Sequence, residues 1–111
     1  MGFTKFYLFN QQQNLTASIA KALGHPARVA ILESILHCDT CCSDDLEKII
    51  PLSQATISQH LSVLVISGVI RTFVRGNNRT FLINPCAIEE LEKYLIFTRL
   101  TNARNSSDKA A

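Results

Sequence analysis

The stretch HCDTCCSDDL, at residues 37–46, contains three of the four cysteines in this 111-residue chain. Thiolates are soft ligands that bind zinc, copper(I) or trivalent arsenic and antimony. Cys38 and Cys41 have the spacing of a metal half-site, and Cys42 can join them on one ion if the segment is a loop. Three thiols suit a pyramidal trivalent metalloid, so Cys38, Cys41 and Cys42 are the predicted metal-binding residues.

The same thiols also permit redox sensing. When it is oxidised, Cys38 can form a disulfide or polysulfide bridge with Cys41, with Cys42 or with Cys86. The cysteines can instead be packing residues without a sensing role. The sequence leaves these three interpretations open.

Composition and charge restrict the class of protein. A chain of this length with 47% apolar residues is typical of one domain, and its formal charge of +2 is too small to establish a nucleic-acid partner. The longest apolar stretch, LSVLVISGVI, is shorter than the roughly 18 residues of a membrane span, so we expect a cytoplasmic protein with reduced thiols and no membrane partner. We expect no enzymatic activity, because Ser58 and His60 do not face each other on a helix and the strand-poor pattern lacks the setting of a thiol oxidoreductase.

Capping residues, apolar spacing and turn residues predict a helix-rich chain with one β-hairpin. Asn10 with Gln13 and Asp44 with Glu47 form capping-box patterns, and Ser53 is a further helix cap. The runs VIRTFVR and RTFLIN are strand-like and are joined by GNN, whose residues tolerate positive φ. The expected helices span about residues 10–24, 26–37, 44–50, 54–67 and 87–100, and the expected strands span residues 69–75 and 79–84.

The order of these elements predicts a fold class. A short helix, a tight turn and a longer helix form a helix-turn-helix, and the hairpin behind it is typical of a winged helix. The predicted fold is therefore mainly α with a small β-hairpin, in the order α-α-α-α-β-β-α. We expect an N-terminal arm at residues 1–9, a winged-helix domain at residues 10–100 and a disordered tail at residues 101–111.

The helix that follows Ser53 has the composition of a DNA-reading helix. With Ile57, Leu61 and Leu64 turned inward, its exposed residues are short and polar, and residues 51–70 carry no charged side chain. Such residues can bond base edges in the major groove, whereas ordinary surface helices carry Lys and Glu. Arginines and asparagines of the hairpin can bind phosphate or reach the minor groove. The predicted DNA-binding residues are Ser53, Gln54, Ala55, Thr56, Ser58, Gln59, His60, Arg71, Arg75, Asn77, Asn78 and Arg79.

Two segments, KALGHPARVAILESIL and LSQATISQHLSVLVISGVI, resemble the ArsR/SmtB family of bacterial metal- and metalloid-responsive repressors. The resemblance covers about residues 17–95. It implies a winged-helix homodimer that pairs through its first and last helices and leaves a palindromic operator when an inducer binds. It also implies that Gln54, Ala55, Ser58 and Gln59 read bases, and it matches Cys38 and Cys86 to the pair that some relatives use for redox sensing. The list of candidates therefore includes Cys38 with Cys86 as a redox pair.

Two features depart from the family pattern. Ser62, Val65 and Ile66 stand where relatives often carry Lys or Arg, so phosphate binding would depend on the hairpin, or Val65 and Ile66 contact something else. The common arsenic site is Cys-x-Cys at the start of the short helix, but here the second cysteine position falls on Asp44 or Ser43. The family's arsenic site therefore cannot be carried over residue by residue.

The expected function is a homodimeric transcriptional repressor bound to double-stranded operator DNA. Arsenite, antimonite or a soft metal ion at Cys38, Cys41 and Cys42 would be the inducer, with no obligatory cofactor. The alternatives are a repressor that senses oxidants or reactive sulfur through Cys38 with Cys86 or another cysteine, and a family member without a thiol inducer. A winged helix that docks a protein, with hairpin arginines that only protect a sheet edge, is a further alternative.

Overall fold

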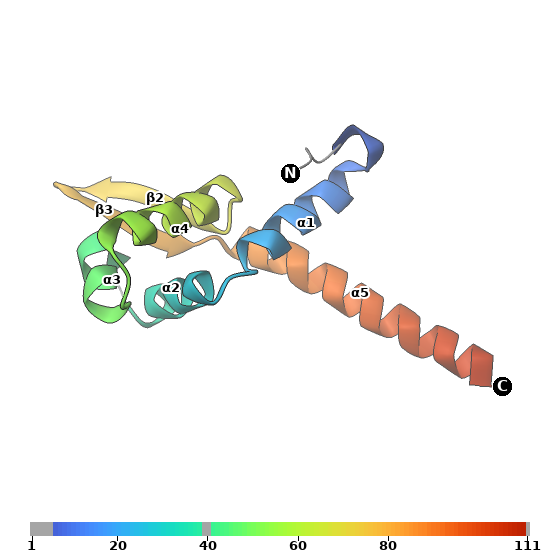
Figure 1. The fold of residues 1–111 in the computed structure, drawn as a ribbon. Helices are drawn as coiled ribbons and strands as arrows, with labels where there is room; N and C mark the ends of the chain where they lie inside the picture. Colours follow the sequence, from blue (N-terminus) through green and yellow to red (C-terminus); the bar gives the residue numbers. More distant parts are fainter. Residues whose placement is uncertain (1–5, 39–40, 111) are drawn as a thin grey trace.

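The computed structural model describes residues 6–38 and 41–110, without the side chains of residues 41 and 107–110. In chain order the elements of this part are η1 (Phe6–Leu8), α1 (Gln11–Ala22), α2 (Pro26–His37), β1 (Cys41–Cys42), α3 (Ser43–Ile49), α4 (Gln54–Ile66), β2 (Ile70–Arg75), β3 (Asn78–Ile83) and α5 (Pro85–Ala110). Figure 1 shows α2, α3, α4 and the strands grouped together, while α1 meets the first turns of α5 and both of these helices extend away from that group.

Side-chain caps fix where two of the helices begin. At α1, Asn10 Oδ1 accepts the backbone N–H of Gln13 at 2.7 Å, and Gln13 Oε1 accepts the backbone N–H of Asn10 at 3.1 Å. At α4, Ser53 Oγ accepts the backbone N–H of Thr56 at 3.2 Å. Each cap satisfies a backbone donor that has no partner within the helix, which stabilises the helix start by about 1 kcal/mol. Both caps were predicted from the sequence, and the structure confirms them.

A single cluster of buried side chains holds α3 and α4 against α1, α2 and the sheet. Leu46 of α3, Ile57 and Leu64 of α4 and Ile31 of α2 are almost wholly removed from solvent. Burial of one such side chain contributes roughly 1.5–3 kcal/mol, so these contacts set the position of α4. The whole cluster comprises Ile19, Ala22, Ile31, Leu32, Ile35, Leu46, Ile50, Ile57, Leu61, Leu64, Val69, Ile70, Phe81 and Ala87.

The sheet has the strand order β1-β3-β2, and both pairings are antiparallel. β2 and β3 form the hairpin of the wing, in which Arg75 lies opposite Asn78. Gly76 turns the chain between them with a φ of 64°, a conformation that favours glycine. β1 joins the outer edge of β3 and places Cys42 opposite Thr80. The segment Cys41–Cys42, called the thiol segment below, is therefore part of the wing sheet.

The predicted winged helix-turn-helix is confirmed, but two local predictions near the thiols are wrong. The segment around Cys41 and Cys42 was expected to be a loop, yet its backbone forms β1. α3 is capped by Cys42 with Asp45, and the expected capping box of Asp44 with Glu47 does not form. The pairing of β1 with β3 moves the helix start, and such pairing between distant residues leaves no mark in local sequence.

The last helix is longer than predicted. It was expected at residues 87–100, with a disordered tail at residues 101–111, whereas α5 runs from Pro85 to Ala110. The polar composition of this segment suggested disorder, but residues 101–110 contain neither Gly nor Pro to end a helix. Ala111 and the first five residues of the expected N-terminal arm lie outside the described residues.

Candidate nucleic-acid interface

α3 and α4 form the helix-turn-helix. The chain bends by 119° between them, close to the upper end of the range of about 90–120° for this motif. Leu46 packs beneath α3 and Ile57 beneath the first turns of α4, so both helices rest on the same core. Among the described helices no single one is long and apolar enough to cross a membrane, and α3 with α4 meets that criterion only as this bent pair.

The first two turns of α4 present an uncharged polar surface. Gln54, Ala55, Ser58 and Gln59 are exposed, as predicted for residues that read bases. Thr56 is half-buried, and its hydroxyl lies 2.9 Å from that of Ser53. These two hydroxyls are engaged in the helix cap, so the free hydrogen-bonding groups on this face are the two glutamines and Ser58.

His60 lies apart from this exposed surface. Its ring is half-buried and packs on His25 at the start of α2, with the ring centroids 4.5 Å apart. Arg28 Nη1 lies 3.4 Å from His60 Nδ1. Of the residues predicted to contact DNA on α4, His60 is therefore the one that faces α2.

The wing arginines are all exposed but do not form one cluster. Opposed residues in an antiparallel pair share a face and neighbours along a strand alternate, so Arg71 and Arg75 project from one face of the hairpin. Arg79, opposite Val74, projects from the other face. A cleft of about 210 Å³ between α4 and the wing is lined by Arg79 together with polar residues of α4 such as Ser58. Arg79 is thus the wing arginine that the fold brings beside the polar face of α4.

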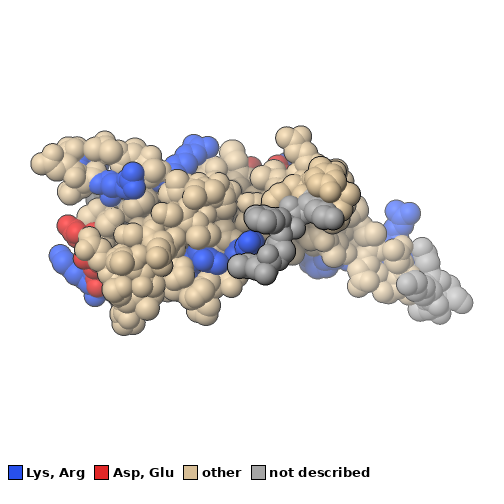
Figure 2. Space-filling model, turned by 45° about the horizontal axis from the view of Figure 1, so that its top comes forward, with Lys and Arg blue, Asp and Glu red and all other residues tan. Residues whose placement is uncertain are grey.

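Basic side chains do not form a continuous band in the view of Figure 2, where Lys and Arg occur as separate groups, one of them directly beside acidic residues. Ile66, at the end of α4, is 86% exposed, and Val65 is half-buried. These apolar residues stand at positions where family members often carry Lys or Arg, the departure already noted in the sequence. α4 itself carries no Lys or Arg, and the positive charge in the cleft beside it comes from Arg79 of the wing.

The four cysteines occupy different settings. Cys38 ends α2, is half-buried and packs against the core, whereas Cys86 is exposed at the start of α5. Cys42 precedes α3, and its backbone N–H and thiol both donate to Asp45 Oδ2, at 3.1 and 3.2 Å. The side chain of Cys41 lies outside the described residues. In residues 6–38 and 41–110, as far as side chains are described, no three His, Cys, Asp or Glu residues meet as a metal site.

The contact between Cys42 and Asp45 has an electrostatic consequence. Hydrogen bonds from the backbone and the thiol of Cys42 lower the pKa of Asp45, with a smaller contribution from Lys48. The carboxylate accepts a hydrogen bond from the thiol, which carries the proton in this contact. A soft ion at Cys42 would have to displace that proton, and it would release Asp45 from its partner.

A second cleft connects the thiol segment with the wing. It has a volume of about 270 Å³ and is lined by Cys42, Ser43, Asp44, Asn77, Asn78 and Arg79. Sequence reasoning placed Cys42 beside the helix-turn-helix but not beside the wing tip. Residues 42 and 79 are far apart in the chain, and only the pairing of β1 with β3 brings them to one cleft.

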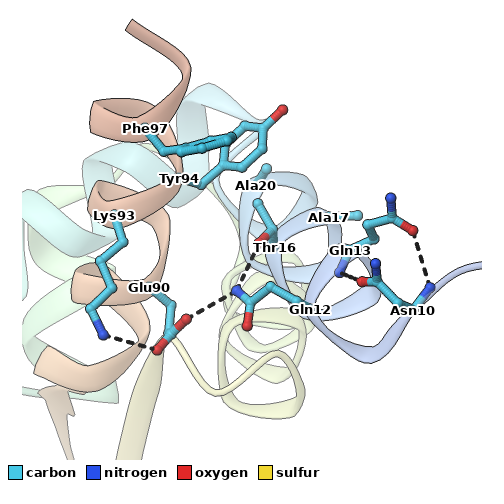
Figure 3. A pocket seen from close by; sticks show the side chains of 10 residues that line it. All are labelled: Asn10, Gln12, Gln13, Thr16, Ala17, Ala20, Glu90, Lys93, Tyr94 and Phe97. Atoms are coloured by element: carbon cyan, nitrogen blue, oxygen red, sulfur yellow. Dashed lines mark hydrogen bonds and ion pairs between the residues drawn. The ribbon is translucent and has the colours of Figure 1, made fainter. Parts of the chain in front are cut away.

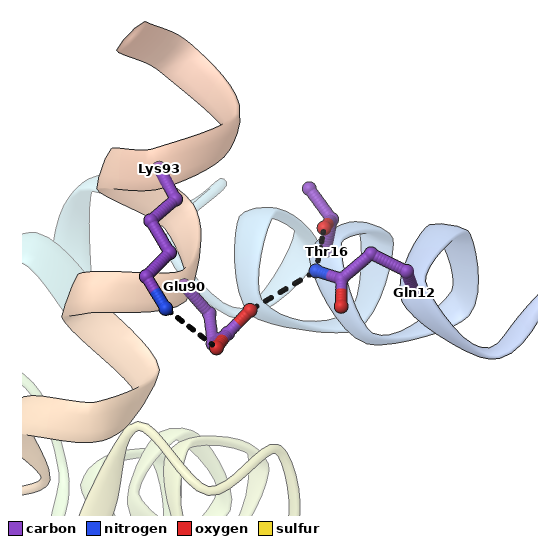
Figure 4. A network of polar contacts seen from close by, with 4 residues as sticks. All are labelled: Gln12, Thr16, Glu90 and Lys93. Atoms are coloured by element: carbon purple, nitrogen blue, oxygen red, sulfur yellow. Dashed lines mark hydrogen bonds and ion pairs between the residues drawn. The ribbon is translucent and has the colours of Figure 1, made fainter. Parts of the chain in front are cut away.

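α1 and α5 enclose a third, larger cleft of about 800 Å³ (Figure 3). Tyr94 and Phe97 of α5 and Ala17 and Ala20 of α1 line it, and both aromatic side chains are at least half exposed. Polar groups close one end, where Gln12 Nε2 donates to Glu90 Oε2 at 3.0 Å (Figure 4). Further large apolar side chains are exposed on the same two helices and before them, namely Phe6, Tyr7, Leu8, Phe9, Leu15, Ile88, Leu95, Ile96 and Leu100.

The order of helices, the polar start of α4 and the wing beside it define a winged-helix DNA-binding protein. The sequence profile described as "Bacterial regulatory protein, arsR family" matches residues 25–72, which include both helices of the motif. The chain belongs to this family of DNA-binding transcriptional regulators. This family is not a class of enzymes.

Individual relatives agree with this assignment. An uncharacterised HTH-type transcriptional regulator of Mycobacterium tuberculosis, Rv0081, is 35% identical over 97 residues, which are 87% of this chain and 82% of that protein. Its crystal structure matches with a TM-score of 0.62 over 93% of this chain and all of that chain, at 30% identity. The arsenical resistance operon repressor of Staphylococcus aureus is 28% identical over 79% of this chain and 84% of its own length. An ArsR-like regulator from Rhodococcus sp. RHA1 shares the fold with a TM-score of 0.81, at 18% identity over 89% and 92% of the two chains.

Proposed function

We propose that this regulator is a homodimeric repressor that reads operator DNA with α4 and leaves it when a trivalent metalloid or a soft metal ion binds the cysteines around β1. The observation that carries the DNA-reading part is the exposed, uncharged start of α4, with Gln54, Ser58 and Gln59 free to bond base edges. Arg79 lies in the adjoining cleft and supplies positive charge for a phosphate.

The proposed dimer uses α1 and α5. These helices expose Tyr94, Phe97 and several other large apolar side chains around an open cleft, and a contiguous apolar surface of this kind favours a protein partner over solvent. One structural neighbour is described as a homodimeric winged helix-turn-helix DNA-binding domain, a possible regulator of the same family from Mycobacterium bovis. A twofold axis through this surface would present two copies of α4 to successive major grooves.

The proposed inducer acts on the wing as well as on α3. Soft ions prefer thiolates, and an arsenical resistance operon repressor is among the relatives of this chain. An ion at Cys42 would break the hydrogen bond to Asp45 at the start of α3 and strain the pairing of β1 with β3. Both effects reach elements that frame the DNA-reading surface. Release requires that the inducer binds the DNA-free form more tightly than the bound form.

Redox sensing is the second candidate. Cys38 and Cys86 are both free thiols in this structure, and Cys86 is exposed to solvent oxidants. Oxidation of this pair would join the end of α2 to the start of α5, and oxidation of Cys38 with Cys41 or Cys42 would join the end of α2 to β1. The two candidates differ at Cys86, because the redox candidate pairs Cys38 with Cys86 and the metalloid proposal does not require Cys86.

DNA reading is tested by fluorescence anisotropy with a labelled duplex, obtained by in vitro selection against the wild-type protein. Gln59→Ala should weaken binding to this duplex by about 1–3 kcal/mol and leave binding to a scrambled duplex unchanged. Gln11→Ala, an exposed glutamine at the start of α1, is the control and should bind both duplexes like the wild type. Equal loss of affinity for both duplexes would contradict base reading by α4.

The inducer is tested with the same duplex and stoichiometric arsenite, zinc or a polysulfide. Arsenite should release the wild-type protein, and single replacements of Cys38, Cys41 or Cys42 by Ser should abolish the response without abolishing DNA binding. Cys86→Ser is the matched control and should respond to arsenite like the wild type. Affinity unchanged by arsenite, together with polysulfide release that needs Cys38 and Cys86, would replace the metalloid proposal with redox sensing.

A further inference from the structure

Arg28 connects three elements at the back of the DNA-reading helix. Its Nε donates to the backbone carbonyl of Ala22 at 2.6 Å, and its Nη2 donates to that of Lys21 at 3.3 Å. Both carbonyls belong to the last turn of α1. Its Nη1 lies 3.4 Å from Nδ1 of His60 on α4. One guanidinium on α2 therefore contacts the end of α1 and the middle of α4.

The chemistry of this contact defines the protonation state of His60. A guanidinium has only N–H donors, so His60 Nδ1 can take part only as an acceptor. The ring must then be neutral and carry its proton on Nε2. A protonated ring has a donor at both nitrogens, and it would direct an N–H and a positive charge at Arg28.

His25 completes the cluster at the start of α2. Its ring packs on that of His60 with an interplanar angle of 50°, and its own Nδ1 accepts the backbone N–H of Ala27 at 3.0 Å. This bond caps α2, whose first turn also carries Arg28. The two histidine rings and the guanidinium thus form one contact surface between α2 and α4, and the groups that act on His60 include no carboxylate to balance a positive charge on its ring.

We propose that Arg28 and His60 are positioning residues that fix α4 relative to α1 and α2, and that protonation of His60 opens this link and weakens DNA binding. The proposal rests on the proposed DNA-reading role of α4. Arg28 therefore joins the end of α1, a helix of the proposed dimer surface, to α4, the helix proposed to read bases.

The surroundings of His60 set the direction of the pH dependence. Burial lowers the pKa of His60 from its ordinary value of 6.5, and the positive charges of His25 and Arg28 on α2 lower it further. α1 contributes backbone carbonyls to the cluster, and α4 itself has no charged residue. Because the folded chain holds the ring neutral, the stability that the link contributes is complete above pH 6.5 and is lost as the pH falls through the lowered pKa.

The test is a pH profile of binding to the selected duplex, measured by anisotropy from pH 5.5 to 7.5. Wild-type affinity should fall by roughly three- to tenfold toward pH 5.5, within the limit of about tenfold per pH unit for one proton. In His60→Asn the side-chain oxygen retains an acceptor near the position of Nδ1 but does not titrate. This variant should bind like the wild type at pH 7.5 and should have a flatter profile. His37→Gln removes an exposed histidine outside the cluster and should keep the wild-type profile.

A second readout needs no DNA. Amide hydrogen exchange in α4, corrected for the intrinsic pH dependence, should speed up at pH 5.5 in the wild type and in His37→Gln but not in His60→Asn. Arg28→Lys keeps the charge and loses the three-way contact, so exchange in α4 should be faster at both pH values. Equal acid sensitivity of the wild type and His60→Asn would overturn the inference. If the wild type binds no DNA at any pH but shows the expected exchange pattern, the DNA-reading role of α4 would be overturned. The contact between Arg28 and His60 would still be supported.

Discussion

Cys42 lies opposite Thr80 in the sheet, and Thr80 follows Arg79 of the wing directly in the chain. This pairing makes the thiol segment the third strand of the wing, and the same cysteine donates two hydrogen bonds to Asp45 at the start of α3. A chemical change at one thiol can therefore act on both elements that flank the polar face of α4.

The contact between Cys42 and Asp45 predicts a specific acid sensitivity. The pKa of Asp45 is lowered from 3.8 by its hydrogen bonds to Cys42, so the stability it contributes is present above pH 3.8 and is lost as the pH falls through the lowered pKa. In urea unfolding from pH 2 to 6, Asp45→Asn should be less stable than the wild type above pH 4 and should lose less stability below it. Asp44→Asn, in the same exposed turn, is the control and should follow the wild-type profile. Parallel profiles for the wild type and Asp45→Asn would rule out this coupling.

Two apolar residues of α4 should differ sharply in their effect on stability. Leu64 is wholly buried, and Leu64→Ala should lower the free energy of unfolding by about 2–5 kcal/mol because it leaves a cavity. Ile66 is the matched control on the same helix, and Ile66→Ala should change it by no more than about 0.5 kcal/mol because that side chain is exposed. Urea unfolding at one fixed protein concentration measures both. Similar losses for the two variants would mean that α4 is packed differently.

The wing should contribute to DNA affinity through charge. Arg79→Ala should lower affinity for the selected and the scrambled duplex alike and reduce the slope of log K against log salt by about 1. Arg104→Ala removes the same charge in the second half of α5 and should leave the slope unchanged. Anisotropy titrations at several salt concentrations give the slopes. An unchanged slope for Arg79→Ala would remove this arginine from the interface.

The surface between α1 and α5 should decide the oligomeric state. Phe97 is 66% exposed in the single chain and lines the cleft, so Phe97→Asp should leave the fold intact and place a charge in the proposed dimer contact. Its dimer dissociation constant, measured by sedimentation equilibrium, should rise at least tenfold, or about 1.4 kcal/mol. Val74→Asp alters a comparably exposed apolar residue of the wing and should not change the constant. A monomeric wild type at micromolar concentration would contradict the dimer itself.

Several features were determined by local sequence. The caps at Asn10 and Ser53 place donors and acceptors within three residues of each other, so they form wherever the helix forms. The spacing of Ile57, Leu61 and Leu64 defines the buried side of α4, and that in turn exposes Ala55 and Gln59 on the opposite side. The caps and the buried side of α4 can be predicted from sequence because helix geometry depends on near neighbours in the chain.

Other features were decided only by the tertiary structure. No local pattern shows that Cys42 joins the edge of β3, that Arg79 and Arg75 project from opposite faces of the wing, or that His60 turns toward His25 and Arg28. Each depends on contacts between residues that are distant in the chain. The entropic cost of bringing such residues together is offset only when the core has assembled. The sequence alone therefore determined where α4 begins and which side of it is buried. The folded chain decided which elements a thiol or a histidine can influence.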